Sequence, residues 1–349
     1  MAAKLSDSYE IRRANLADHR QQILSLWSLI EGATPPGIEK LEWFYTANPA
    51  GPGSAYFLWY KPEDRPVGVV CAGARDFQSE DGRIQGAVFG DLIIEQAHRS
   101  LGPGIMLQRE SLTLALEDYA LVYGFPNPNA AKLCTRAGYP LHDSMVTMVI
   151  PLNHAHYVAR ILPQPLARLL APVTQRLHEL TITVGCRCLR QKWRETQVQR
   201  QFVDDVWSRL APFRQLVGVR DWTYFSWRFN AHPGHAYKTF GIHNDAGEPG
   251  GYLVYTIDAQ NMIAIVDGLA IDDASFAALI YHFLARMHQR RVVSVALQLQ
   301  DSEQAAMQLL RKPGFRPRAT AHVFWCTGQD ATPAADAQPI YLRRADSDM

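Results

Sequence analysis

The segment Arg99-Ser-Leu-Gly-Pro-Gly104 contains the residue types that bind an anion with backbone groups. It follows an apolar, strand-like run from Ala87 to Ile94 and opens a helix-like run. Glycines at 102 and 104 let the backbone approach a ligand because they have no Cβ. Pro103 suits the first helical position, where its missing N–H costs little. The turn therefore predicts unpaired N–H groups at a helix N-terminus, which is a site for a phosphate or pyrophosphate.

Two further segments must lie beside this turn if it is to form a site. A strand from Ala120 to Phe125 is closed by Pro126-Asn-Pro-Asn129, since such residues end strands. A helix from about Ala130 to Ala137 then ends at Gly138, and Met145–Ile150 has the apolar pattern of a last strand. These elements predict an α/β domain over residues 1–150.

The second half of the chain repeats motifs of the first in the same order. Trp43-Phe-Tyr-Thr-Ala-Asn-Pro49 returns as Trp227-Arg-Phe-Asn-Ala-His-Pro233. Asp91-Leu-Ile-Ile94 returns as Asp267-Gly-Leu-Ala-Ile271. The repeat predicts a duplicated α/β domain, with the second copy over residues 206–327.

Bulk composition bounds the class of protein. The chain has 349 residues, enough for about two domains. Its 47% hydrophobic and 20% charged residues are typical of globular proteins, and a net charge of +1 argues against a nucleic-acid binder. No apolar run reaches the ~18 residues of a membrane span, and the start has no signal-peptide core. Five cysteines, an odd number, predict reduced thiols and a cytoplasmic protein.

Residues 151–205 differ from both halves. They are rich in leucine and arginine, and the interruptions by Pro163, Pro165 and Pro172 predict broken helices. Two interpretations stay open: a helical connector whose charges face solvent, which the prolines favour, or a basic amphipathic helix in weak peripheral contact with a membrane or an acidic polymer. The composition of residues 328–349 predicts a tail without regular structure at its start, followed by a candidate strand at Ile340–Leu342. The histidine pairs His154/His156 and His232/His235 lack partners at ligand spacing, so no metal site is expected.

The two motifs around the turn resemble those of the GNAT acetyltransferase superfamily. Arg99-x-x-Gly102-x-Gly104 is similar to its (Arg/Gln)-x-x-Gly-x-(Gly/Ala) loop for acyl-coenzyme A (CoA). Asn127-x-x-Ala130-x-x-Leu133-x4-Gly138-Tyr139 is similar to its second motif. With the repeat, the chain resembles a tandem GNAT protein. The resemblance implies an α/β (α+β) fold of two GNAT-like domains, each a mixed, mostly antiparallel sheet flanked by helices, joined by a helical insertion.

The resemblance also implies acetyl-CoA as co-substrate and the residues that would hold it. The fourth and fifth strands would diverge, free strand-four backbone would pair with the pantetheine amides, and the turn would hold the pyrophosphate. The expected cofactor-binding residues are Leu92, Ile93, Ile94, Arg99, Ser100, Leu101, Gly102, Pro103, Gly104, Ile105 and Asn127.

Acyl transfer needs three groups: a base that takes a proton from the acceptor, a hydrogen-bond donor that stabilises the oxyanion, and an acid that protonates the leaving thiolate. The candidate bases are Asp91, Glu95 and His98, although His98 is better explained as a surface histidine on an exposed turn. Asp91 is equally well explained as a structural carboxylate, because it recurs at Asp267. The candidate acids are Cys134 and Tyr123, although Cys134 is better explained as a small buried residue. A strand-four N–H near Leu92 or Ile93 is the expected oxyanion donor.

The sequence departs from the family's pattern at two places. Cys134 stands where the family often has its tyrosine acid, and the second half has neither the glycine pair nor that tyrosine, whose position holds Leu310. We therefore expect one CoA site, in the first domain. Aromatic residues at 43–45 and Tyr139 either line an acceptor pocket or belong to the core.

The resemblance predicts an N- or O-acetyltransferase that moves an acetyl or other acyl group from CoA to an amine or hydroxyl of a small molecule or glycan precursor. The alternative is a catalytically inactive GNAT-fold binding or scaffold protein, favoured by Cys134 and the degenerate second half. A third interpretation, a tandem ligase that uses aminoacyl-tRNA, is at odds with the retained turn. The sequence gives no indication of the oligomeric state.

Overall fold

The structure is a computed structural model that describes residues 5–30, 35–154, 164–189, 192–210, 215–328 and 340–347. For residues 164, 165 and 167–171 only the backbone is described. The expectations for His156 and for most of the tail, 329–339 and 348–349, lie outside the described residues.

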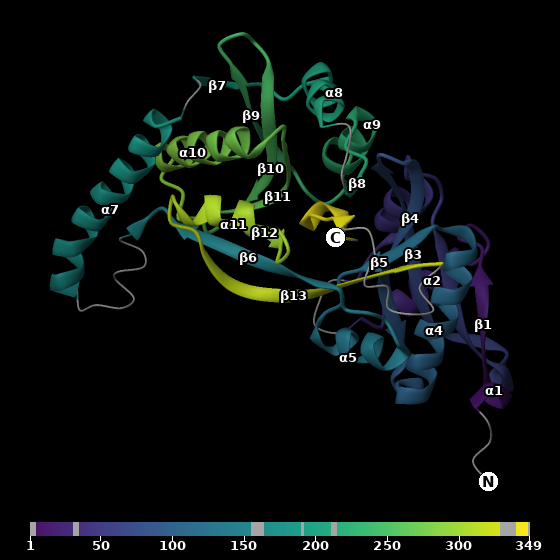
Figure 1. Cartoon of the computed structure of the whole chain (residues 1–349). Helices are drawn as coiled ribbons and strands as arrows, with labels where there is room; N and C mark the ends of the chain where they lie inside the picture. The colour runs from purple at the N-terminus through teal and green to yellow at the C-terminus, as the bar shows by residue number, and fades with distance from the viewer. Residues whose placement is uncertain are drawn as a thin grey trace.

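The first half contains the strands and helices that the sequence predicts around the glycine turn (Figure 1). In chain order they are α1 (Leu5–Ser8), β1 (Tyr9–Ala14), α2 (Arg20–Trp27), α3 (Ile38–Lys40), the π-helical turn η1 (Leu41–Thr46), β2 (Ser54–Tyr60), η2 (Lys61–Glu63), β3 (Arg65–Ser79), β4 (Gly82–Ile94), η3 (Gln96–His98), α4 (Leu101–Asp118), β5 (Leu121–Gly124), α5 (Pro128–Ala137) and β6 (Asp143–Pro151).

The second half repeats this order after a connecting segment. Its elements are α7 (Gln164–Arg187), β7 (Trp193–Thr196), α8 (Arg200–Arg209), β8 (Leu216–Gly218), α9 (Trp222–Phe225), the π-helical turn η4 (Ser226–Asn230), β9 (Lys238–Asn244), β10 (Pro249–Ile257), β11 (Met262–Ala270), α10 (Asp273–Gln289), β12 (Ser294–Gln300), α11 (Gln304–Arg311), β13 (Arg316–Thr327), β14 (Ile340–Tyr341) and η5 (Arg344–Asp346). The sequence predicts broken helices in the connector, but α7 is one continuous helix of 24 residues with Pro172 inside it, and the strand β7 and the start of α8 follow it.

The two halves exchange their last strands. In the sheet order β1-β2-β3-β4-β5-β13-β6-β12-β11-β10-β9-β7, β13 of the second half lies beside β5, and β6 of the first half lies beside β12. β6 and β13 also pair with each other, antiparallel, at the centre. The predicted mixed, mostly antiparallel sheet with flanking helices is confirmed, but the exchange joins two sheets into one.

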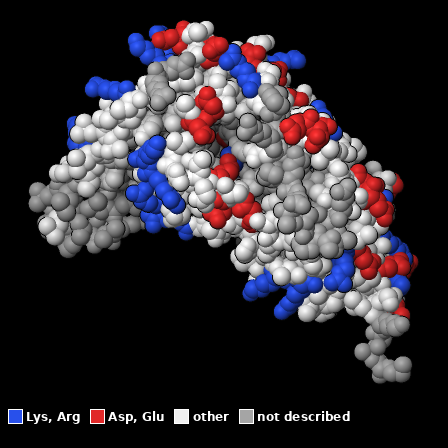
Figure 2. Space-filling model, viewed as in Figure 1, with Lys and Arg blue, Asp and Glu red and all other residues white. Residues whose placement is uncertain are grey.

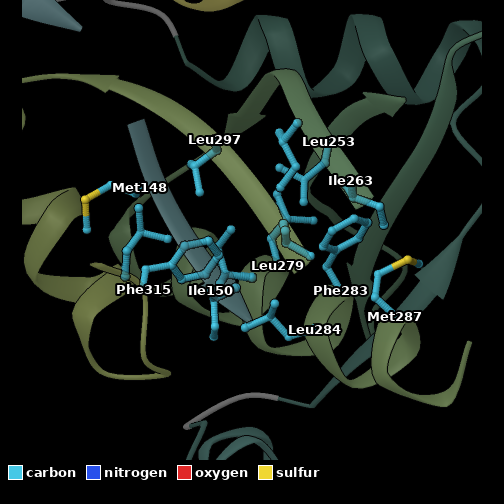
Figure 3. Packing of buried hydrophobic residues seen from close by; sticks show 14 of the residues in the cluster. Met148, Ile150, Leu253, Ile263, Leu279, Phe283, Leu284, Met287, Leu297 and Phe315 are labelled. Carbon is cyan, nitrogen blue, oxygen red and sulfur yellow. The ribbon is translucent and has the colours of Figure 1, made fainter. Parts of the chain in front are cut away.

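Side chains of the exchanged strands complete the core of the opposite half. Met148 and Ile150 of β6 are buried among second-half residues such as Phe283 and Leu284 of α10 (Figure 3). Conversely, Phe324 of β13 belongs to the cluster that lies under α4. Each half therefore buries its full apolar surface only in the presence of the other.

A reciprocal tryptophan pair forms a second contact between the halves. The indole N–H of Trp43 in η1 donates to the carbonyl of Trp227 in η4, and the indole of Trp227 donates to the carbonyl of Trp43, both at 3.0 Å. The two rings stack with centroids 5.1 Å apart. The repeated motif thus meets its own copy across an approximate two-fold axis.

The last described segment is buried between the halves. β14 is a strand, as predicted for Ile340–Leu342; it pairs in parallel with β8, and η5 follows two residues later. The Asp346 carboxylate accepts from Arg75 of β3 at 2.9 Å and from Arg220 at 2.5 Å. Arg220 also pairs with Asp267 of β11 at 3.0 Å, and all four side chains are nearly inaccessible. Burial opposes the charge on Asp346, but Arg220 and Arg75 outweigh it and hold the pKa of that carboxyl below its usual value.

Asp346→Asn should lower the free energy of unfolding by about 3–5 kcal/mol. The amide keeps the shape of the side chain but leaves the buried Arg75 and Arg220 guanidiniums without a full counter-charge. Chemical denaturation followed by tryptophan fluorescence measures the change.

Glu117→Gln is the matched control. The Glu117 carboxylate pairs with Arg13 at 2.7 Å, but both side chains are exposed, so the neutral variant should unfold as the wild type does. Equal stability of the Asp346→Asn protein and this control would show that the buried pairs do not stabilise the assembly of the two halves.

Candidate active site

β4 and β5 diverge in front of the glycine turn. They pair in parallel from Gly86–Leu121 to Phe89–Gly124, and β4 then continues to Ile94. Within the described chain, residues 90–94 have no strand partner on their β5 side, since β4 neighbours only β3 and β5 in the sheet. Leu92 and Ile93 therefore present backbone groups to the gap, as the family resemblance implies, whereas the Ile94 carbonyl accepts from the Arg99 side chain.

A bulge at Asp91 produces this divergence. The β3–β4 register shifts between Val69 and Cys71, and Asp91 adopts a left-handed backbone with φ of 50°. That conformation costs a non-glycine residue about 1–2 kcal/mol. The buried carboxylate accepts from Lys40 Nζ at 2.8 Å and from the Tyr45 hydroxyl at 2.7 Å, which offsets the strain. Asp91 thus anchors the bulge; its assignment as general base stays a prediction.

The glycine turn ends in an open helix N-terminus. Ser100 precedes α4 in an extended conformation, and no side chain in the described part of the chain caps the first turn. The helix begins at Leu101, so Pro103 lies two residues further into the first turn than expected, still where its missing N–H costs little. Arg99 Nε donates to the Ile94 carbonyl at 3.1 Å, which brings the turn next to the free end of β4.

The two glycines of the turn have different surroundings. A Cβ on Gly104 would lie 3.2 Å from Leu133 of α5, so this glycine permits the close packing of two helices. A Cβ on Gly102 would meet only Leu5, at an ordinary 3.4 Å. Position 102 therefore accepts a side chain at the helix N-terminus without a change in packing, whereas position 104 does not.

Glu95 and His98 lie at the turn but are already engaged. Glu95 pairs with Arg65 at 2.6 Å on the surface. His98 accepts or donates at 2.8 Å with the Tyr9 hydroxyl and packs on Tyr60. The expectation of an exposed His98 is wrong, because the aromatic side chains of β1 and β2 cover its ring.

The two candidate acids are buried. Burial raises the pKa of the Cys134 thiol to about 12, which makes it a weak donor to a thiolate of ordinary basicity, near 8.5. Tyr123 lies on β5 at the divergence, but its hydroxyl donates to the Asp346 carbonyl at 2.8 Å, and burial raises its pKa well above 10. Their catalytic roles stay predictions.

The remaining predicted residues are placed by α5 and by the core. The Asn127 side chain accepts from the N–H groups of Asn129 and Ala130, so it caps α5. Ser100 and Leu101 are exposed, and Ile105 is half-buried on the first turns of α4. Tyr139 donates to the Gln108 carbonyl from a buried position. The aromatic residues 43–45 are also buried in the core, where Phe44 borders a small cavity of about 10 Å³.

The second half has the same divergence but a closed helix N-terminus. β11 and β12 pair from Met262–Ser294 to Ile265–Leu297 and then separate. α10 starts almost at once, and its N-cap Asp272 accepts from the Ser275 N–H at 2.7 Å, where an anion would otherwise bind. A cavity of about 180 Å³ remains between the two strands, bordered by carboxylates including Asp272 and Asp273. This electrostatic environment opposes a pyrophosphate.

The chain's own C-terminal segment also enters this second gap. The Tyr341 hydroxyl donates to the Gly268 carbonyl at 3.1 Å, and the Leu342 N–H donates to the Gln300 side chain at 2.7 Å. The strand backbone that corresponds to the free β4 edge of the first half is therefore hydrogen-bonded in the second half. The sequence indicates a candidate strand here but neither its place between the halves nor the partners Arg75 and Arg220 of Asp346, because three residues show no periodicity that would place the strand.

Comparisons with known proteins agree with this architecture. No protein-family model matches the sequence, and no curated protein matches it in sequence. Among solved structures, a protein of unknown function from Enterococcus faecalis V583, a probable N-acyltransferase, has a TM-score of 0.64 at 14% identity, over 92% of this chain and 72% of that one. A GCN5-related N-acetyltransferase from Anabaena variabilis has a TM-score of 0.58 at 12% identity, over 91% and 72%.

A third similar structure, Saccharomyces cerevisiae N-myristoyltransferase with bound myristoyl-CoA, has a TM-score of 0.53 at 11% identity, over 94% of this chain and 80% of that one. The fold is therefore that of the GNAT N-acyltransferases, as the resemblance of the two sequence motifs implies.

Cys134 should resist alkylation in the folded protein. With a pKa of about 12, only about one thiol in ten thousand ionises at pH 8, and the side chain is buried. Iodoacetamide labelling at pH 8, read by peptide mass spectrometry, measures the rate. Exposed Cys188 is the internal control, and all five cysteines should react in denaturant. Labelling of Cys134 as fast as Cys188 would contradict the buried placement of this thiol.

Proposed function

We propose that this protein transfers an acyl group, acetyl in the first place, from CoA to an amine or hydroxyl of a small molecule or glycan precursor. The proposal rests on one observation: a free strand edge and an uncapped helix N-terminus lie next to each other. The free edge of β4 beyond Phe89 faces the gap, and the uncapped N-terminus of α4 lies at its end. The pantetheine arm of CoA carries amides that need backbone groups as partners, which the β4 edge supplies. The pyrophosphate needs N–H donors, which the N-terminus of α4 supplies.

The first half, residues 1–150, would carry the chemistry. Backbone of Leu92–Ile94 would pair with the pantetheine arm, while the turn from Arg99 to Ile105 and the neighbouring Asn127 would receive the pyrophosphate end. The acceptor nitrogen or oxygen attacks the thioester carbonyl carbon and loses its proton to a base, for which Asp91 and Glu95 are the candidates. A strand-four N–H stabilises the oxyanion. The carbon–sulfur bond then breaks, and the leaving thiolate takes a proton.

The second half, residues 206–327, would act as scaffold. Its helix N-terminus is capped by Asp272 and its strand gap receives the C-terminal segment. We therefore propose a single CoA site per chain. The odd number of cysteines supports a cytoplasmic setting. Charges of both signs are spread over the face shown in Figure 2, which supports a small acceptor rather than a polyanion.

One observation favours the alternative, a GNAT fold that binds CoA without turnover. Neither candidate acid is well suited to protonate the CoA thiolate. The Cys134 thiol has a pKa of about 12, and the Tyr123 hydroxyl already donates a hydrogen bond to the Asp346 carbonyl. Release of the CoA thiol over a panel of amines, amino sugars and alcohols separates the two functions. Acceptor-dependent release supports transfer; tight binding without release over the whole panel supports the alternative.

Titration calorimetry with acetyl-CoA should give one site per chain, and Gly102→Glu should weaken it by at least about 100-fold. The added carboxylate would lie within several ångströms of the pyrophosphate, where like charges repel by about 4 kcal/mol at an intermediate dielectric. The variant should remain folded, because a Cβ at position 102 meets only Leu5.

Gly102→Gln is the control of equal size and no charge, and its affinity should stay within a few-fold of wild type. Equal affinity of the Glu and Gln variants would mean that the cofactor binds elsewhere. Absence of binding to the wild-type chain would remove the proposed function altogether.

A further inference from the structure

The helix α7 presents an apolar stripe to solvent. Half of the large apolar side chains that are exposed in the described chain lie on this one helix; their exposed fractions are 50% for Leu166, 55% for Val173, 60% for Leu177, 59% for Leu180 and 55% for Val184. The helix has 24 residues, about 36 Å, and projects along the edge of the molecule (Figure 1). A surface helix normally turns such a stripe toward the core.

Contacts of the opposite face fix this orientation. Ile182 is buried in the second-half core, and Gly185 packs against the Tyr281 ring of α10. Gln175 donates to the Leu152 carbonyl at 2.9 Å, and His178 contacts the Pro313 carbonyl at 3.1 Å. At about 100° per residue, positions 175, 178, 182 and 185 lie roughly opposite the apolar stripe. The helix therefore cannot rotate to bury the stripe without the loss of these contacts.

The charges beside the stripe are basic. Arg176 and Arg187 lie along the same border of it, and both are exposed. The one acidic residue of the helix, Glu179, is already paired with Arg176 at 2.8 Å. In Figure 2 the described upper part of α7, at the left edge, shows uncharged and basic surface in this view. A second copy of the helix would bring these arginines together with no free carboxylate of α7 to pair them, whereas anionic headgroups supply that charge.

We propose that α7 docks this protein on an anionic lipid surface. The helix lies in the plane of the interface, the leucine and valine stripe enters the boundary between headgroups and acyl chains, and the arginines contact lipid phosphates. The helix lies on the bilayer and does not cross it: among the described residues, no helix combines the length and apolarity that a span requires. This surface is separate from the candidate active site, so the proposal does not depend on acyl transfer.

Co-sedimentation of the full chain with sucrose-loaded vesicles tests the proposal. Vesicles of phosphatidylcholine with phosphatidylglycerol should pellet the protein, and pure phosphatidylcholine vesicles should pellet much less. Leu177→Gln with Leu180→Gln should lower the partition coefficient at least about tenfold, since two apolar side chains no longer enter the lipid. Both positions are exposed and glutamine is a good helix former, so the fold should persist. Arg176→Gln and Arg187→Gln should each cost about fivefold, and less at high salt.

Leu29→Gln is the matched control, an exposed leucine far from α7 in the sequence, and it should bind vesicles as wild type does. Equal pelleting of the double variant, or no pelleting with anionic vesicles, would overturn the proposal. A wild-type dimer in sedimentation velocity that the double variant abolishes would also overturn it, since a second copy would then cover the stripe. Acetyl-CoA affinity should be unchanged in all α7 variants, so the two proposals fail separately.

Discussion

The pairing of Asp346 with Arg75 and Arg220 determines how the two halves are placed. One arginine comes from β3 of the first half and the other from the start of the second, and a single buried carboxylate neutralises both. Buried charges tolerate little displacement, because an unpaired one costs several kcal/mol. The same segment accepts from Tyr123 on β5, the strand that borders the candidate cofactor gap. The geometry of that gap therefore depends on a contact made by the end of the described chain.

The two halves show how similar backbones acquire different chemistry. Both have a parallel pair of strands that diverges after four residue pairs, and both place an aspartate just beyond it. Asp91 holds a bulge through Lys40 and Tyr45, whereas Asp267 is paired with Arg220. The decisive difference is the next turn: α4 begins without a side-chain cap, and α10 begins with Asp272 bonded to its own first turn. The N-terminus of α4 can therefore accept an anion, whereas the N-terminus of α10 is already occupied by the Asp272 carboxylate.

Local sequence patterns predicted the turn, the strand before it and the helices α4 and α5, because spacing and capping residues act within a few positions. The GNAT fold was predicted from the resemblance of two motifs to that family. The strand exchange was beyond these patterns: the apolar alternation of β6 is the same whether it joins β5 or β12. The burial of His98 was mispredicted because Tyr9 and Tyr60, which cover it, are distant in sequence. For the same reason the partners of Asp91 and the role of Asp346 could not be predicted.

The exchanged strands also constrain the order in which the chain can fold. Gly124 of β5 pairs with Phe324 of β13, two hundred residues further along the chain. At a synthesis rate of ~5–20 residues per second, the edge of β5 therefore emerges at least about ten seconds before its partner exists. During that interval an unpaired strand edge is open to other chains. The exchange of strands thus leaves the β5 edge exposed while the second half is synthesised, which favours aggregation of a truncated chain.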